Sequence, residues 1–140
     1  MKIKGLLVYS IGVFLTLSQF SCNKLIEDKD GDWDDNIKLS TRLVNFTGTQ
    51  NIVEIKTQNT WWWINSVNTN NEYFMPKYQT NMFDKENIIV NTDWLTVERK
   101  DGKTIELTAT NNTTQGKRTA TISLQAGNYF DYITVIQSNK

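Results

Sequence analysis

Four blocks of alternating apolar and polar residues fill the last third of the chain, and this pattern constrains the fold more than any other feature. The blocks cover residues 94–97, 104–109, 118–124 and 132–137. A period of two residues is typical of a strand with one buried face and one exposed face. Turn-forming pairs stand between the blocks: Asp101-Gly102, Asn111-Asn112, Gln115-Gly116 and Gly127-Asn128. The pattern therefore predicts four short antiparallel strands.

The same signals predict further strands upstream. They cover residues 37–46, with a kink near Thr41, and residues 52–57, 61–64 and 88–90. The segment between residues 65 and 91 is otherwise less regular, and the chain after Cys22 has neither a helical period nor an internal repeat. Short strands that alternate with turns at this spacing indicate an all-β fold, an immunoglobulin-like antiparallel β-sandwich of about seven to eight strands over residues 37–140.

Three consecutive tryptophans open the third expected strand. On a strand, Trp62 and Ile64 share one face, whereas Trp61 and Trp63 share the other. We expect Trp62 and Ile64 in the core, because a tryptophan beside an isoleucine suits a sandwich interior. Trp61 and Trp63 would then point outward, or would pack the following irregular segment onto the sheet.

Residues 1–21 have the organisation of an export signal. Lys2 and Lys4 precede an apolar run over residues 5–17, which is shorter than the about 20 residues of a membrane-spanning helix. Cys22 is the only cysteine and follows this run. The segment resembles a bacterial lipoprotein signal, although Gln19 stands where the stricter pattern has an aliphatic residue. The resemblance implies that Cys22 becomes a lipid-carrying N-terminus on the outer membrane.

An acidic segment follows the expected lipidation site. Residues 27–35 hold six acids and one base, so residues 22–36 are expected to form a solvated tether. A calcium loop is the alternative, but Gly31 is fourth from Asp28 rather than sixth, and Leu39 stands where the loop needs glutamate. Acids after a lipidated cysteine also resemble the export signal of surface-exposed lipoproteins in gut-type Gram-negative bacteria, which implies a cell-surface location.

Length and charge limit the number of domains and the kinds of partner that the chain can have. Loss of residues 1–21 would leave 119 residues, which is enough for one domain with a sizeable core. The loss of Lys2 and Lys4 leaves 13 basic and 15 acidic side chains, a net charge of −2. This balance gives no reason to expect a nucleic acid partner.

The mature chain resembles the BACON domain, a family named for a proposed role in carbohydrate binding in Bacteroidetes. The matching pieces are the strand 52–57 with Trp62 after it, the segment 94–97, the Asn112 turn, and the segments 118–122 and 133–137. The chain departs from the family in its tryptophan triplet and in the long link to Trp94. The resemblance implies an immunoglobulin-like sandwich over residues 37–138 that has no catalytic residues and either binds glycans or acts as a spacer.

Enzyme chemistry has little support in the sequence. The chain has no histidine, which removes histidine bases, serine-histidine triads and histidine metal sites. We expect no catalytic residues, no cofactor and no metal site, although a carboxylate pair for glycoside hydrolysis depends on spacing in three dimensions. Arg118 is expected to tie down the turn at Asn112, and Lys117 and Asp131 are expected to be ordinary surface charges.

Glycan binding is the sharper functional hypothesis. Flat aromatic rings can cover the apolar faces of sugars, while neighbouring amides take the hydroxyls. The candidate glycan-binding residues are Trp61, Trp63, Tyr73, Phe74 and Tyr78, several of them in an asparagine-rich stretch. Structural packing of these aromatics is the competing interpretation. A structural spacer, or a protein-interaction accessory of an outer-membrane complex that pairs through an open sheet edge, is the alternative function.

Overall fold

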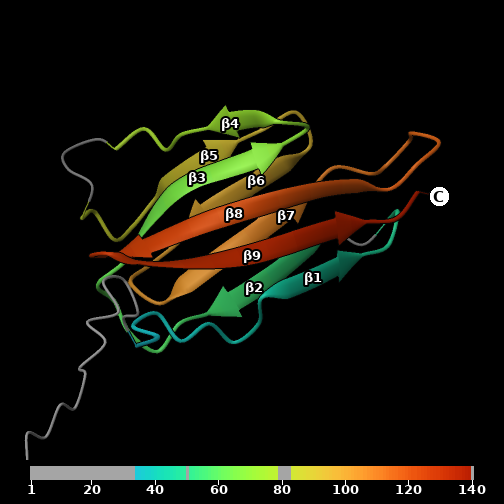
Figure 1. The fold of residues 1–140 in the computed structure, drawn as a ribbon. Coiled ribbons are helices and arrows are strands. Elements are labelled where there is room, and N and C mark those ends of the chain that lie inside the picture. The colour runs from blue at the N-terminus through green and yellow to red at the C-terminus, as the bar shows by residue number, and fades with distance from the viewer. Residues whose placement is uncertain (1–33, 50, 79–82, 140) are drawn as a thin grey trace, which may run out of the picture.

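A computed structural model describes residues 34–49, 51–78 and 83–139 as two β-sheets packed face to face (Figure 1). The first sheet has the strand order β1 (Leu43–Phe46), β9 (Tyr129–Gln137), β8 (Arg118–Ala126), β3 (Trp63–Thr69) and β4 (Glu72–Phe74). The second has the order β2 (Ile52–Lys56), β7 (Thr104–Ala109), β6 (Leu95–Arg99) and β5 (Ile88–Asn91). No helix of sufficient length and apolar character to cross a membrane occurs among these residues. The expected signal peptide, Cys22 and most of the acidic tether lie outside them.

The expected β-sandwich is confirmed, with differences in detail. The described residues form nine strands, and the strand missing from the sequence-based expectation is β4. The expected strand over residues 37–46 is wrong in its first half, where Leu39 makes only an isolated bridge to Thr57. The purely antiparallel arrangement is also wrong for one pair, because β1 runs parallel to β9. A first strand that enters along the last one cannot be inferred from alternation alone.

Two tight turns place the strands of the five-stranded sheet. Asn70 and Asn71 join β3 to β4 with φ angles of 51° and 65°, the pattern of a type I′ hairpin turn. Gly127, with a φ of 62°, and Asn128 join β8 to β9. A side chain at residue 127 would be strained at this φ, which explains the glycine.

The core lies between the sheets and follows the predicted alternation. Trp62 and Ile64 are both buried, as expected from the tryptophan triplet. A less expected core residue is Arg99, which is 1% exposed and holds its guanidinium 3.8 Å from the centre of the Trp62 ring. Arg99 donates hydrogen bonds to the carbonyl oxygens of Trp62 and, at 2.8 Å, of Thr60. Burial lowers the pKa of Arg99 to about 10. The cation thereby fixes the backbone on both sides of Trp61.

The expected role of Arg118 is confirmed. Its guanidinium donates to the side-chain oxygen of Gln137 at 2.9 Å and to the carbonyl of Thr110, and it lies 4.6 Å from the centre of the Trp94 ring. The buried amide of Asn112 donates to the carbonyl of Gly116 at 2.9 Å. Both side chains therefore hold the turn before β8, and Lys117 is an exposed charge as expected.

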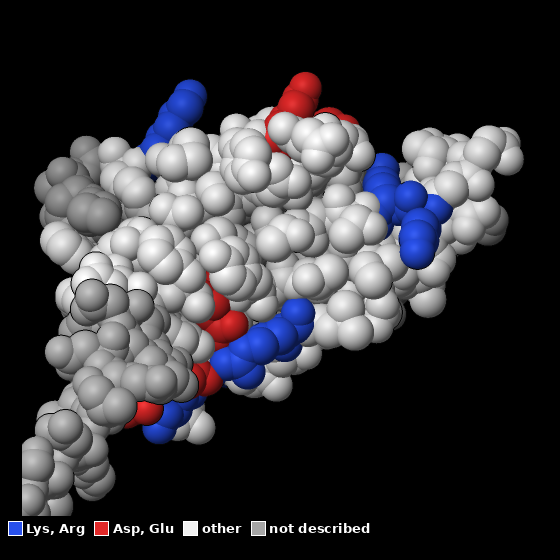
Figure 2. Space-filling view, viewed as in Figure 1, with Lys and Arg blue, Asp and Glu red and all other residues white. Residues whose placement is uncertain are grey.

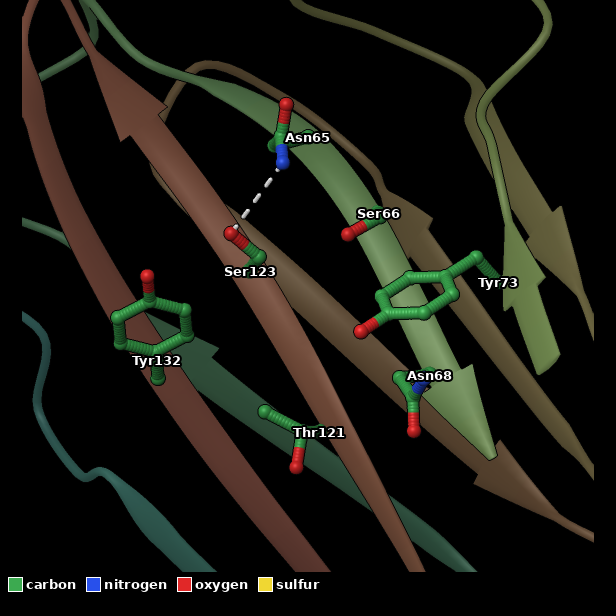
Figure 3. A pocket seen from close by; sticks show the side chains of 7 residues that line it. All are labelled: Asn65, Ser66, Asn68, Tyr73, Thr121, Ser123 and Tyr132. Carbon is green, nitrogen blue, oxygen red and sulfur yellow. Dashed lines mark hydrogen bonds between the residues drawn. The ribbon is translucent and has the colours of Figure 1, made fainter. Parts of the chain in front are cut away.

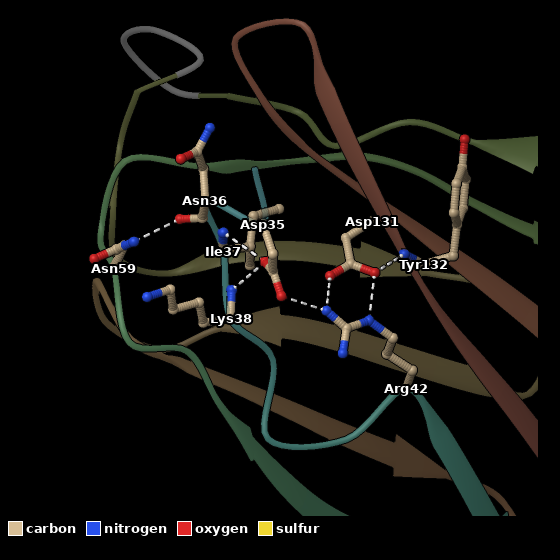
Figure 4. A network of polar contacts seen from close by, with 8 residues as sticks. All are labelled: Asp35, Asn36, Ile37, Lys38, Arg42, Asn59, Asp131 and Tyr132. Atoms are coloured by element: carbon tan, nitrogen blue, oxygen red, sulfur yellow. Dashed lines mark hydrogen bonds and ion pairs between the residues drawn. The ribbon is translucent and has the colours of Figure 1, made fainter. Parts of the chain in front are cut away.

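Asp131 is not an ordinary surface charge, and that expectation is wrong. Its carboxylate is buried at the start of β9 and accepts two hydrogen bonds from Arg42, at 2.8 and 2.7 Å (Figure 4). Arg42 also donates to Asp35 at 2.6 Å. The hydrogen bonds that Arg42 donates to Asp131 and Asp35 raise the pKa of Arg42. This network fastens the first described residues to the strand that carries Tyr132.

Asp35 also organises the backbone at the entrance to the sandwich. Its carboxylate accepts hydrogen bonds from the backbone N–H groups of Ile37 at 3.1 Å and Lys38 at 2.6 Å (Figure 4). Burial works in the opposite direction, but these bonds and the Arg42 guanidinium lower the pKa of Asp35 below its usual value of 3.8. The carboxylate is therefore ionised at neutral pH and stays paired with Arg42.

Candidate functional site

The outer face of the four-stranded sheet is an ordinary charged surface. Its outward positions include Glu54 and Lys56 on β2, Glu98 on β6 and Glu106 on β7. Lys56 pairs with Glu54 at 3.0 Å. Charges of both signs keep such a face solvated and discourage association. The side-chain composition of this face can be compared with that of the outer face on the opposite side of the molecule.

The outer face of the five-stranded sheet, called the uncharged face below, differs in chemistry. None of its outward positions in the described strands holds a charged residue, and Figure 2 shows its centre white with charges at the margins. The outward side chains, assigned from strand register and burial, are Leu43, Asn45, Trp63, Asn65, Ser66, Asn68, Tyr73, Thr119, Thr121, Ser123, Gln125, Phe130, Tyr132, Thr134 and Ile136. Hydroxyls, carboxamides and aromatic rings thus replace charges, which points to a binding surface.

A shallow pocket of about 370 Å³ lies on the uncharged face. Tyr73 from β4 and Tyr132 from β9 stand on its two sides and are 73% and 52% exposed. The floor between the two tyrosines, shown in Figure 3, is formed by Asn65, Ser66, Asn68, Thr121 and Ser123. We call these seven residues the tyrosine pocket.

Hydrogen-bonding groups on the pocket floor are largely available to a ligand. Asn65 donates a long bond of 3.4 Å to the hydroxyl of Ser123. The side chains of Asn68 and Thr121 make no hydrogen bond to any part of the chain that the structure describes. Carboxamides and hydroxyls both donate and accept, so the floor can match the hydroxyl groups of a neutral ligand.

Trp61 forms a second exposed aromatic position at the end of the sandwich. Its ring is 56% exposed and meets Trp63 edge-on, with 5.8 Å between ring centres. It borders two shallow hollows of about 390 and 190 Å³, whose other linings include Asn36 in both, Asn59 in one and Asn128 in the other. A Cβ atom on Gly127 would lie 3.3 Å from the Trp61 ring, so glycine lets the ring rest on the β8–β9 turn. None of the described residues that line these two hollows is charged, although Lys85 donates to the hydroxyl of Thr60 at 3.5 Å at their edge.

The structure separates the five predicted glycan-binding residues. Tyr73 lies in the tyrosine pocket and Trp61 at the end of the sandwich, both exposed. Trp63, for which outward exposure and packing were both left open, lies on the outer side of β3 but is only 6% exposed, so the packing alternative describes it. The rings of Trp61 and Phe83, the latter 5.5 Å away, meet it edge-on.

Phe74 and Tyr78 are both partly buried and pack against the core. Phe74 is opposite Val67 in the register and packs against the core. Tyr78 is half-buried and donates its hydroxyl to the carbonyl of Ile64 at 2.5 Å. Burial raises the pKa of Tyr78 to about 12. Phe74 therefore anchors β4 to the core, and Tyr78 attaches the segment after β4 to the sheet. Both roles agree with the competing packing interpretation.

Sequence reasoning missed Tyr132 and the polar floor. A usable signal was present in the alternation itself. The alternating polar positions are Thr119, Thr121 and Ser123 in one segment and Tyr132 and Thr134 in the next, whereas those of 95–99 and 104–109 include glutamate. The difference in charge between the exposed positions of neighbouring blocks would have distinguished the two outer faces.

Among the described residues, neither the tyrosine pocket nor the Trp61 hollows are lined by an acid or a base. Across residues 34–49, 51–78 and 83–139, no three histidine, cysteine, aspartate or glutamate side chains come together as metal ligands could. Serine and threonine hydroxyls without a neighbouring base are weak nucleophiles. The arrangement can hold a ligand through stacking and hydrogen bonds.

The fold and this surface define a small β-sandwich domain with a polar and aromatic candidate binding face. Residues 83–138 match the BACON family, described as "Putative binding domain, N-terminal". The resemblance seen in the sequence is confirmed over these residues, which include β5 to β9 and therefore Thr121, Ser123 and Tyr132.

Structural comparison extends the likeness in fold to more of the chain. An NMR structure of a protein from Bacteroides thetaiotaomicron is similar, with a TM-score of 0.56 and 20% sequence identity. The similarity covers 81% of this chain and 94% of that protein. A search among curated proteins gave no match. The structural likeness concerns the fold, so the ligand must be argued from the surface itself.

Proposed function

We propose that this chain is a non-catalytic surface lipoprotein whose sandwich domain binds carbohydrate on the uncharged face. The observation that carries the proposal is the tyrosine pocket. Two exposed tyrosines flank a floor of carboxamides and hydroxyls, on a face whose described strand positions hold no charge. The match of residues 83–138 to a family described as a binding domain supports the same class of function.

The chemistry of the pocket fits a sugar better than other small ligands. A pyranose ring has an apolar face formed by its C–H groups, and a tyrosine ring offers a flat surface of similar size. The sugar hydroxyls need partners that both donate and accept, which Asn68 and Thr121 supply. A lipid or an apolar peptide would bury these amides without partners, at a cost in free energy.

The proposed location rests on the N-terminal sequence. The basic start, the apolar run and the single Cys22 support lipid attachment, and the acids after Cys22 support export to the cell surface. Such an anchor would hold the domain at the outer membrane, where polysaccharides are encountered. Cys22→Ser is expected to move the chain from the membrane fraction to the soluble fraction and to abolish labelling by radioactive palmitate. A variant that stays in the membrane fraction and still incorporates palmitate would contradict the lipid anchor.

Binding is best tested with the soluble chain from Asn23 to Lys140, since the buried core of the described residues lies within it. We expect saturable binding of at least one neutral glycan from a panel of mucin and plant saccharides, measured by calorimetry. Tyr132→Ala should weaken that binding about fivefold, because one aromatic contact contributes about 1 kcal/mol and the ring closes one side of the pocket.

A matched control variant is Ile52→Ala. Ile52 is exposed to a similar degree, but on the charged outer face of the other sheet, so its loss should not change glycan affinity. Thermal unfolding would confirm that both variants fold. Absence of binding across the whole panel, or equal losses in Tyr132→Ala and Ile52→Ala, would contradict the proposal and favour the spacer or protein-interaction alternative.

A further inference from the structure

The strand register places the tyrosine pocket and Trp63 on one line along the uncharged face, and ring contacts place Trp61 beyond Trp63 at the end of that line. Asn68 lies opposite both Tyr73 and Thr121, which forms the first row across the sheet. The second row is Ser66, Ser123 and Tyr132, and the third is Trp63, Gln125 and Phe130. Trp61 follows Trp63 at the end of the sheet, where its ring meets the β8–β9 turn.

These rows give the surface a length. Successive outward residues on a strand are about 6.8 Å apart, so three steps from the first row to Trp61 span about 20 Å. Exposed aromatic rings occur in each row or at its end: Tyr73, Tyr132, Phe130 and Trp61. We call this surface the binding strip. It is longer than one sugar ring and offers repeated stacking positions.

None of the described residues that line the tyrosine pocket and the Trp61 hollows is charged, and Lys85, which donates to the hydroxyl of Thr60 at 3.5 Å, stands at the edge of the Trp61 end. The hollows beside Trp61 are lined by Asn36, Asn59 and Asn128 together with small residues, so the polar groups remain carboxamides at this end. Arg42, which contacts the residue before Tyr132, is already paired with the carboxylates of Asp131 and Asp35. A sulfated, sialylated or uronate sugar would therefore lose hydration in the tyrosine pocket, where no described lining residue supplies a counter-charge.

The Trp61 end is also held rigidly, as a binding position should be. Arg99 donates to the carbonyls of Thr60 and Trp62, the residues immediately before and after Trp61. The ring itself rests on Trp63 and on the turn at Gly127. A side chain fixed before binding loses little conformational entropy on contact with a ligand.

We propose that the binding strip holds an internal stretch of a neutral polysaccharide chain several sugars long, running along the strands from the tyrosine pocket to Trp61. This inference rests on the proposed carbohydrate binding and adds the class, length and direction of the ligand. Trp61 is the distal subsite, and it contacts only ligands long enough to leave the tyrosine pocket.

The test is a length series of neutral oligosaccharides, from disaccharides to hexasaccharides of cello-, xylo-, manno- and malto-type, with oligogalacturonides as acidic probes. Calorimetry on the soluble chain is expected to show affinity that rises with length for at least one neutral series. Trp61→Ala should reduce hexasaccharide affinity about tenfold and leave disaccharide affinity unchanged, whereas Tyr132→Ala reduces both. Trp61→Phe should recover part of the hexasaccharide affinity.

The outcomes separate this inference from the proposed function. Neutral binding that does not increase beyond the disaccharide, or that Trp61→Ala leaves intact at every length, would overturn the strip and retain the tyrosine pocket. Binding of oligogalacturonides alone would overturn the inference that the ligand is a neutral polysaccharide. Absence of binding by every probe would overturn both the strip and carbohydrate binding. Ile52→Ala, on the charged face, serves as the control throughout.

Discussion

Replacing Arg99 by methionine tests the central packing of the sandwich and the support of Trp61 together. Methionine keeps an unbranched apolar stem of similar reach beside Trp62, so it changes mainly the charge and the hydrogen bonds. Arg99 has no carboxylate partner in any hydrogen bond that the described residues make. Its guanidinium is stabilised by backbone carbonyls, among them those of Thr60, Trp62 and Gly102.

The expected loss of stability follows from those carbonyls. The two closest, at Thr60 and Trp62, would each lose a charge-assisted bond, and a buried acceptor without a partner costs about 1–3 kcal/mol. Contacts of 3.3 Å to Asp84 and Gly102 add less. Removal of a buried charge relieves its desolvation and offsets part of the loss. We expect Arg99→Met to lower the free energy of unfolding by about 2–4 kcal/mol.

Urea unfolding followed by tryptophan fluorescence measures this loss. With a slope near 1.5 kcal/mol per molar urea, the midpoint should fall by about 1–3 M. Lys100→Met is the control, since Lys100 is the next residue and pairs with Glu106 on the exposed side, where the midpoint should hardly change. A midpoint for Arg99→Met within experimental error of the Lys100→Met midpoint would refute the assignment of Arg99 as the organiser of this region.

Two further predictions concern buried polar groups. Burial raises the pKa of Tyr78 from 10.0 to about 12, so the stability that its neutral phenol contributes is complete below pH 10 and is lost as the pH rises through 12. The difference in unfolding free energy between wild type and Tyr78→Phe should therefore shrink over that window, and a constant difference would contradict it. Trp62 donates through its indole N–H to the hydroxyl of Thr57 and the carbonyl of Asn59, whereas the buried N–H of Trp94 meets no acceptor among the described residues. Trp62→Phe should thus cost about 1–2 kcal/mol more than Trp94→Phe in urea unfolding, and equal costs would argue against it.

Part of the candidate site was accessible from the sequence and part was not. Alternation identified Trp62 and Ile64 as core residues, because side-chain direction on a strand follows from spacing alone. It also put Trp63 on the outer side correctly. It could not show that Trp63 is covered there, since Phe83 is distant in the sequence and reaches it only through the path of the segment after β4. Outward direction and exposure are different properties.

The hairpin that presents Tyr73 had a readable signal that was not used. Asn70-Asn71 is a pair suited to positive φ angles, and recognition of a type I′ turn would have predicted β4 and the pairing of Tyr73 with Asn68. The burial of Asp131 had no such signal. Its partner Arg42 lies at the start of the chain's first strand, and the contact exists only because that strand runs parallel to β9.

The sequence by itself determined most of the strands, the turns between most of them and the two-sheet class, because each depends on alternation and turn residues within a few positions. The tertiary structure alone decided which exposed positions become neighbours. Tyr73, Thr121 and Tyr132 come from three strands, and sheet order brings them to one pocket. Local pattern fixes the direction of a side chain, whereas the neighbours it meets depend on long-range pairing, which leaves no trace in local spacing.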